Sequence, residues 1–428
     1  MTTREQALEA AHRWIHGALP ADAAARRVHS HEFEHGWVVW PEPSPVQVDP
    51  LTGERRAPEE IGAACGVVDR LTGDLTVWPS VPVPDVVRLY LDHLGASGYD
   101  PSLPPATGPG TRAVIRHRDA LGAEHSLTVA SAHGLPHPAL RAWEQLRGQG
   151  VPLQDVLGVH TDLRLAALPG GYAAHAVAAA LPGVPVTHGL RYGPRFDGRA
   201  EAVRALPPAD GVRPNRVPFP RTVPPAPPEA GPAVAARLAA VFGADGVRRF
   251  DPAAVAAADL PDAVARPLLD AGLPIAVDGL FTVHHPQSDG VLDGTRTGAP
   301  LPDAAGHLAA LGRGGSATAG ARQGLLGQVV LGGDGHALVT VDTAQGRVRA
   351  IDPDTATARY CNADVTAFAR SLALAAERLP ALRGLHPYAA GAAVAEFQWA
   401  LAALDGTVFT DPENWWAVLV EQLWHGLL

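Results

Sequence analysis

The pattern of apolar positions over the first hundred residues predicts a small α+β domain. Apolar side chains recur at helical spacing over residues 3–17, and Thr3 with Gln6 forms a capping-box pattern at the start of this segment. The period then changes to two, and an aromatic and β-branched run at 37–40 follows a turn, as in a β-hairpin. A further strand pair and a helix at about 84–95 complete the expected domain.

The middle of the chain alternates short β-branched runs with short helical segments. This order is typical of a layered α/β sheet, and a stretch rich in Gly, Ser and Pro at 95–110 separates it from the first domain. The expected strands lie at 112–118, 126–131, 156–160 and 184–187, and the expected helices at 139–146 and 171–181.

A proline-rich segment marks the clearest boundary in the chain. Nine prolines lie between residues 207 and 228, and such a stretch is extended and semi-rigid. A helix at about 231–242, strands near 275–284 and 324–352, and closing helices with an aromatic tail are expected after it. The predicted domains are therefore 1–97, 110–206 and 231–428, with a Pro-rich linker at 207–230.

Composition narrows the classes of partner. Apolar residues make up 46% of the 428 residues and charged residues 18%, which is enough to build several cores. The formal net charge is −10 and no basic run occurs, so we expect no strong nucleic-acid binding, which depends on Lys and Arg at phosphates. An acidic chain suits a basic protein partner better, because opposite charge speeds encounter. The abundance of Ala, Gly, Pro and Arg is typical of a GC-rich, for example actinobacterial, genome.

Cysteine usage and hydropathy favour a cytoplasmic protein. Cys65 and Cys361 lie far apart, so they predict neither a disulfide framework nor a cysteine-based metal cluster. Glu5, Glu9 and Arg13 interrupt the opening segment, which therefore does not read as a signal peptide. No run approaches the roughly 20 apolar residues of a membrane span, and we expect no membrane partner.

The segment His31–His35 matches the H-E-x-x-H signature of zinc proteases. That chemistry requires a helix, on which two His one turn apart share a metal. The neighbouring residues predict strands instead, and on a strand His31 and His35 would stand about 13 Å apart at roughly 3.3 Å per residue. We therefore expect a solvated hairpin and no metal centre, with His29 leaving only adventitious metal binding open.

Other short patterns are interpreted as structural. The pair His284-His285 is expected at a strand end, and the glycine-rich stretches 312–315 and 332–335 are expected to be turns. The sequence contains no G-x-S-x-G elbow, P-loop or Rossmann glycine pattern, so the usual anchors of hydrolases and nucleotide-binding proteins are missing.

The middle block carries a family resemblance. Residues 137–142 (H-P-A-L-R-A), 159–173 (V-H-T-D-L-R-L-A-A-L-P-G-G-Y-A) and 186–193 (V-T-H-G-L-R-Y-G) follow the strand and helix order described above. This block, about 110–206, resembles the nucleic-acid and nucleotide deaminase domains at the ends of bacterial polymorphic toxins. Their first motif is H-S-E at a helix start, and their second is T-E-L-x-P-C, with another Cys after a P-G-x-Y-like turn. The resemblance implies a three-layer α/β deaminase-like domain.

Zinc deaminases use one His and two Cys to hold the metal, and a Glu that is not a ligand to move the proton. By the resemblance, His137 retains the His position, whereas Ala139 stands in place of the Glu and Ala166 and Ala173 in place of the two Cys. A methyl group neither coordinates zinc nor carries a proton. We therefore expect an inactive domain with no catalytic residues, no bound metal and no cofactor.

Two alternatives to an inactive deaminase fold stay open. Asp162 and His175 are the nearby residues that could substitute as ligands, although only with an unusual geometry. A deaminase with an atypical active site, or a nucleotide sensor, is therefore one alternative, and an unrelated α/β domain is another.

The C-terminal block contains three informative stretches, 324–330 (G-L-L-G-Q-V-V), 362–368 (N-A-D-V-T-A-F) and 409–421 (F-T-D-P-E-N-W-W-A-V-L-V-E). With these stretches the block, about 232–428, resembles the fourth immunity-protein family of the SUKH superfamily. The resemblance implies a domain that binds and neutralises intracellular toxins, including nucleases and deaminases. The first domain, with G-W-V-V-W at 36–40 and a V-V-D hairpin at 67–73, is similar to a small immunity family of the YrhB type.

Together these patterns predict an α+β multi-domain protein in which α+β domains flank a central α/β deaminase-like domain. The expected function is that of a non-catalytic immunity or antitoxin-type protein. Its expected partner is a protein toxin of the deaminase or nuclease type.

Overall fold

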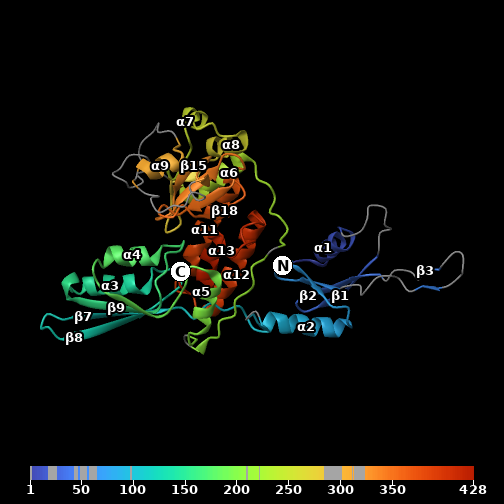
Figure 1. The fold of residues 1–428 in the computed structure, drawn as a ribbon, viewed down its shortest axis with the longest axis horizontal. Coiled ribbons are helices and arrows are strands. Elements are labelled where there is room, and N and C mark those ends of the chain that lie inside the picture. Colours follow the sequence, from blue (N-terminus) through green and yellow to red (C-terminus); the bar gives the residue numbers. More distant parts are fainter. Residues whose placement is uncertain are drawn as a thin grey trace. The chain divides into compact units, whose positions relative to one another are not determined.

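The chain folds into two compact units that contain both helices and sheets, which confirms the expected α+β multi-domain class (Figure 1). The first unit consists of Met1–Pro104 and Asn215–Pro225, and the second of Pro105–Pro214 and Ala226–Leu428. Within the second unit we call 105–214 the central domain and 226–428 the C-terminal domain. The structure is a computed structural model that describes residues 2–17, 27–42, 47–48, 55–56, 65–96, 99–208, 211–220, 222–283, 301–310, 312 and 323–428.

The first unit packs a helix against a four-stranded antiparallel sheet of order β1-β2-β5-β6. The capping box forms as expected, because Thr3 N donates to Gln6 Oε1 at 2.8 Å and Gln6 N donates to Thr3 Oγ1 at 3.4 Å. Ala7 and Ala11 of the helix pack on Trp37 of the sheet. The elements are α1 (Arg4–Gly17), β1 (Val28–Phe33), β2 (Gly36–Pro41), β3 (Gln47–Val48), β4 (Arg55–Arg56), β5 (Cys65–Asp69), β6 (Leu75–Trp78) and α2 (Val83–Ala96).

The central domain contains a four-stranded sheet of order β10-β9-β7-β8, in which β10 runs parallel to β9 and the other pairs are antiparallel. Each expected strand and helix is present with its ends shifted by a few residues, and one helix, α5, was not anticipated. The elements are β7 (Arg112–Arg118), β8 (Glu124–Ala130), α3 (Pro138–Gly148), η1 (Leu153–Asp155), β9 (Val156–Leu163), α4 (Ala173–Ala180), β10 (Val186–Leu190) and α5 (Phe196–Arg204).

Helices α3 and α4 lie on the same face of this sheet (Figure 1). Ala113 and Ile115 of β7 point into the core beneath them, whereas Arg112 and Arg116 alternate with these residues and are exposed. Both helices therefore cover one face of the sheet. The other face carries charged side chains, such as Arg112 paired with Asp162 at 3.0 Å, and the three-layer arrangement stays a prediction.

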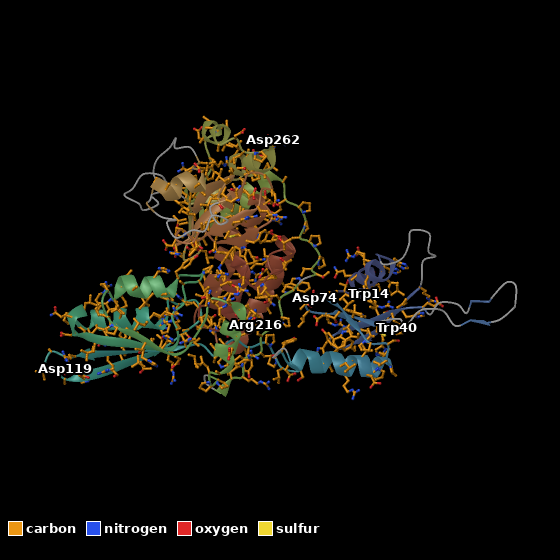
Figure 2. The ribbon with its side chains drawn as sticks, viewed as in Figure 1. Trp14, Trp40, Asp74, Asp119, Arg216 and Asp262 are labelled. Atoms are coloured by element: carbon orange, nitrogen blue, oxygen red, sulfur yellow. The ribbon has the colours of Figure 1, made fainter. Side chains whose placement is uncertain are left out.

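The β7–β8 hairpin extends from this sheet and ends at Asp119, which is labelled in Figure 2. One carboxylate oxygen of Asp119 accepts hydrogen bonds from the backbone N–H groups of Leu121 and Ala123, both at 2.9 Å. This side chain therefore replaces the turn's missing backbone partners, as Asp commonly does.

The C-terminal domain is built on a six-stranded antiparallel sheet of order β13-β14-β15-β16-β17-β18. The strand expected from residue 324 begins later, at Gln328, because a turn containing Gly327 at φ 70° precedes it. The elements are α6 (Gly231–Phe242), η3 (Ala244–Gly246), β11 (Val247–Arg248), α7 (Pro252–Ala257), α8 (Asp262–Asp270), β12 (Leu273–Pro274), β13 (Ala276–Val277), β14 (Phe281–Val283), α9 (Ala304–Ala310), β15 (Gln328–Gly333), β16 (Leu338–Asp342), β17 (Val348–Ile351), β18 (Ala358–Asn362), α11 (Val365–Arg378), η4 (Leu379–Leu382), α12 (Pro387–Leu404) and α13 (Trp415–Trp424).

Helix α13 joins the central and C-terminal domains into one unit. All ten of its residues are buried. Trp416 of α13 packs edge-on against Phe397 of α12, whereas Val418 packs against Leu163 and Ala202 of the central domain. Its apolar side chains favour enclosure, and its two polar side chains, Glu421 and Gln422, are buried with hydrogen-bond partners in the central domain. The last helix of the second unit therefore lies in a core that both domains share.

Candidate functional site

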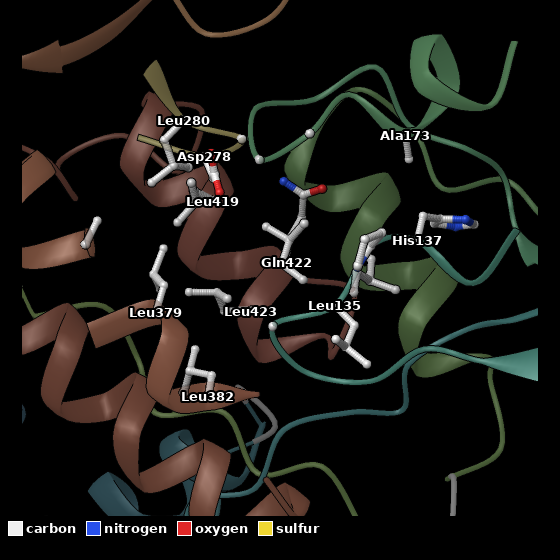
Figure 3. Close-up of a pocket in the computed structure, with 18 of the residues that line it drawn as sticks. Leu135, His137, Ala173, Asp278, Leu280, Leu379, Leu382, Leu419, Gln422 and Leu423 are labelled. Carbon is white, nitrogen blue, oxygen red and sulfur yellow. The ribbon is translucent and has the colours of Figure 1, made fainter. Parts of the chain in front are cut away.

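Three of the four residues predicted at the degenerate deaminase site meet at one cavity. His137, Ala166 and Ala173 line a space of about 810 Å³ in the second unit (Figure 3). The fourth residue, Ala139, lies instead in the core between α3 and the sheet and has no exposed surface. The fold thus gathers His137 and the two expected cysteine positions around one cavity, with the expected glutamate position beside them in the core.

His137 is held at the start of α3 by local backbone chemistry. Pro138 occupies the first helical turn, where its missing N–H leaves no bond unmade, and His137 serves as the N-cap. The backbone N–H of Ala139 donates to His137 Nδ1 at 3.2 Å. Burial lowers the pKa of His137 to about 4, so the imidazole is neutral at pH 7. Because Nδ1 accepts a hydrogen bond, the proton of the neutral ring lies on Nε2.

The loop that carries Ala166 runs from β9 to α4 and ends in an unusual backbone conformation. Tyr172 caps α4 in the left-handed region, at φ 45°. Gly170 precedes it at φ 95°, and a Cβ there would stand 2.6 Å from a methyl group of Leu428. Glycine is favoured there because a side chain is strained at this φ, whereas the Leu428 side chain could move aside. The loop therefore packs against Leu428 of the C-terminal domain.

The C-terminal domain forms the opposite wall of the cavity. Figure 3 shows Leu419, Gln422 and Leu423 of α13, together with Leu379 and Leu382 of η4, across from Leu135 and His137. The Gln422 side chain reaches the loop directly, because its Nε2 donates to the carbonyl oxygen of Pro169 at 2.6 Å. The predicted site residues thus face a protein wall.

A buried carboxylate, Asp334, ties the same loop to the C-terminal domain. Its Oδ2 accepts from the Tyr172 hydroxyl at 2.7 Å and from Trp415 Nε1 at 2.8 Å. Burial raises the pKa of Asp334, and these hydrogen bonds oppose that rise. Beside this group the rings of His175 and His336 stack with their centroids 4.3 Å apart. Asp334 lies in the glycine-rich stretch 332–335 that was interpreted as a turn, and the pattern did not reveal its partners.

A buried ion pair forms a second tie between the two domains. Arg199 of α5 donates through Nε to Glu421 Oε2 of α13 at 2.9 Å, and neither side chain has exposed surface. Glu413 lies 3.4 Å from the same guanidinium and also pairs with Arg359 at 2.8 Å. Burial acts to lower the pKa of Arg199, but the hydrogen bond and charge of Glu421 outweigh burial and raise it. The sequence does not reveal this pairing, because no helix was expected at α5, which carries Arg199.

The two residues considered as substitute ligands lie elsewhere. Asp162 binds the guanidinium of Arg112 at 3.0 Å on the open face of the sheet, and His175 stacks on His336. The metal-ligand cluster found among the described residues is His336, Asp352 and Asp354, which does not include His137. Neither substitute is placed to complete a site with His137.

The H-E-x-x-H segment lies in a hairpin, as expected. His31 belongs to strand β1, and His35 lies in the turn that follows it. Glu32, between them, pairs with Arg70 at 2.7 Å. This segment therefore forms no helix, and the zinc-protease hypothesis, which requires both His residues on one helix, is excluded. The pair His284-His285 lies outside the described residues.

Comparison with family models covers the three parts of the chain in turn. Residues 5–97 match the model of the immunity protein 35-like domain, and residues 108–207 match that of the Xanthomonas-like deaminase. Residues 233–422 match the SUKH-4 immunity protein model. The chain joins two immunity-type domains to a deaminase-like domain. These matches confirm the expected order of SUKH-type and deaminase-like domains, whereas the YrhB type of the first domain stays a prediction.

No curated protein and no solved structure matches the chain. None of the helices in the described part of the chain is long and apolar enough to cross a membrane. The family models therefore carry the comparison, and the SUKH-4 match is the longest of the three.

Proposed function

We propose that this protein is a non-catalytic immunity protein that binds and neutralises a protein toxin. The observation that carries the proposal is the pair of immunity-type domains at 5–97 and 233–422, which flank a deaminase-like domain with alanines at its two expected cysteine ligand positions. The two buried free cysteines agree with a reducing cytoplasm as its location.

The donor set of the central domain does not fit a zinc deaminase centre. Such a centre needs a His and two thiolates around the metal and a carboxylate beside it. The cavity offers one neutral imidazole, His137, and the methyl groups of Ala166 and Ala173. Ala139 has no exposed surface, so a glutamate side chain at that position would have to displace core atoms before it could move a proton. We therefore derive no catalytic step for this domain.

The placement of the C-terminal domain supports a binding role for the pair. Three contacts connect the immunity-type domain to the deaminase-like domain, two of them at the loop between β9 and α4. They are made by Gln422 with Pro169, by Asp334 with Tyr172, and by Glu421 with Arg199. In this proposal the immunity-type domain covers the positions that the resemblance assigns to the deaminase site. The net charge of −10 favours a basic partner for the remaining surface.

Zinc analysis of the purified full chain tests the non-catalytic part. We expect less than about 0.1 zinc per wild-type chain, because a single neutral His does not hold the metal. The Ala166→Cys, Ala173→Cys double variant supplies two thiolates beside His137 and is expected to gain zinc. A matched control places both cysteines on exposed positions of α4, at Ala178 and Ala179. Stoichiometric zinc in the wild type that His137→Asn removes would refute the proposal.

Growth rescue tests the immunity part. The chain is co-expressed with deaminase-type and nuclease-type toxin domains in a host that each toxin kills. Rescue by the chain, with a complex that co-purifies, is the expected result. A chain that rescues against neither class, and that converts cytidine or adenosine as a purified protein, would instead be an enzyme with an atypical site.

A further inference from the structure

The cavity between the central and C-terminal domains has the size of a small-molecule site. Its volume of about 810 Å³ lies within the roughly 300–1,000 Å³ that is typical of ligand pockets. Residues from both domains line it, so neither domain contains the site alone. The positions that correspond to zinc ligands by the resemblance contribute only His137 and two methyl groups, which leaves open space between them.

The walls of the cavity are mostly apolar. Leu165 and Leu135 contribute from the central domain. Leu280, Leu379 and Leu423 contribute from the C-terminal domain and are labelled in Figure 3 with Leu135. The charged residues that line the cavity are exposed, so none of them supplies a buried counter-charge. A charged ligand would therefore lose its hydration inside the cavity without a buried partner, and an uncharged ligand would not. The charged residues are Arg164, Asp278 and Arg383.

The amide of Gln422 supplies a fixed acceptor in this apolar space. Gln422 is only 6% exposed. Its Nε2 donates to the carbonyl oxygens of Pro169 at 2.6 Å and Val418 at 3.3 Å, and these two bonds fix which end of the amide is the nitrogen. Within the described part of the chain, no donor is bonded to Oε1 of Gln422. Figure 3 shows this oxygen on the side of the amide toward His137 and Ala173.

His137 supplies a donor at the other end of the same cavity. Its Nδ1 accepts the Ala139 N–H, so the neutral ring carries its proton on Nε2. The cavity thus presents a donor from the central domain and an acceptor from the C-terminal domain, separated by apolar walls. The Gln422 oxygen is not fully buried, so it remains accessible to a ligand N–H or O–H, which can donate a hydrogen bond to it.

We propose that this cavity binds a small, uncharged, largely apolar molecule that donates a hydrogen bond to Gln422 Oε1 and accepts one from His137 Nε2. A bound molecule touches both domains and therefore stabilises their association.

Two fluorescent probes that differ in a single charged group test the proposal on the full chain. N-phenyl-1-naphthylamine is uncharged and apolar and has one N–H, and 1-anilinonaphthalene-8-sulfonate is the same skeleton with a sulfonate. We expect saturable 1:1 binding of the uncharged probe, measured through the increase in its fluorescence. The sulfonate probe is expected to bind at least tenfold more weakly. An uncharged probe that does not saturate, or that binds no better than the sulfonate, overturns the proposal.

Variants locate the probe. Ala173→Phe fills the cavity and is expected to lower the affinity for the uncharged probe at least tenfold. Ala179→Phe, on the exposed face of the same helix, is expected to leave that affinity unchanged. Gln422→Met keeps the side-chain size, removes the acceptor and is expected to weaken binding about fivefold. Each variant is first compared with the wild type by circular dichroism and melting temperature. If Ala173→Phe does not fold, Ala166→Phe and Gln422→Met decide. Folded variants that bind the probe like the wild type overturn the proposal.

Discussion

Replacing Arg199 by Met removes the positive charge of the buried ion pair while keeping a long apolar side chain. Arg199 and Glu421 both have no exposed surface, and their closest atoms are 2.7 Å apart. In the variant, Glu421 stays inside the shared core without its cation. Water cannot reach it to compensate, because α13 is enclosed along its whole length. The variant therefore measures what an uncompensated charge costs at the junction of the two domains.

We expect Arg199→Met to lower the free energy of unfolding of the second unit by about 3–5 kcal/mol, the range for breaking a buried ion pair on one side. Glu413, at 3.4 Å from the guanidinium, also loses a partner. It keeps its ion pair with Arg359, so it adds little to the loss in the free energy of unfolding. The double variant Arg199→Met, Glu421→Met removes both charges and is expected to recover most of the loss, because an apolar pair of similar volume is often neutral.

Urea unfolding followed by tryptophan fluorescence measures these values, because Trp415, Trp416 and Trp424 all lie in α13 and report on its core. The control is Arg204→Met on the exposed face of α5, which is expected to change stability by no more than about 0.5 kcal/mol. A loss below about 1 kcal/mol for Arg199→Met, or a double variant that is no more stable than the single one, refutes this reasoning.

Two further substitutions test Tyr172, at the end of the loop between β9 and α4, and His137, at the start of α3. Tyr172→Phe removes a donor to the buried carboxylate of Asp334 and is expected to cost about 1.5–3 kcal/mol in the same unfolding assay, and a neutral result would show that Asp334 does not depend on this bond. His137→Asn keeps an N-cap acceptor but does not titrate. Because burial lowers the pKa of His137 from 6.5 to about 4, the unfolded chain takes up this proton first, and the wild type loses stability as the pH falls from 6.5 toward 4. The wild type should lose up to about 3 kcal/mol more than the variant over that range, and a constant difference between the two would contradict the assignment.

Local patterns predicted the elements of the first unit and the central domain well. The Thr3 and Gln6 side chains make the two hydrogen bonds that their spacing indicated, because a capping box involves only four consecutive residues. The same holds for the H-E-x-x-H segment, whose strand neighbours decided its conformation. Three of the four resemblance-based positions also meet at one cavity, since a strand followed by a helix places such residues together.

The tertiary contacts could not be predicted, because they join residues far apart in the chain. Arg199 and Glu421 are separated by 222 positions, and nothing near either residue indicates a buried charge. Gln422 likewise reads as an ordinary polar residue in a helix, yet it is enclosed because the central domain covers it. The third layer expected from the deaminase resemblance stays a prediction, because the sheet face that includes Arg112 carries the exposed side chains of β7.

The position of α13 in the chain sets the order in which the molecule is completed during synthesis. A ribosome adds about 5–20 residues per second, so the 222 positions from Arg199 to Glu421 take on the order of 10–40 s to translate. Throughout that interval Leu163 and Ala202 lack the helix that covers them in the finished core. The nascent central domain therefore presents an apolar face that chaperones can bind, and its maturation waits for α13 to leave the ribosome.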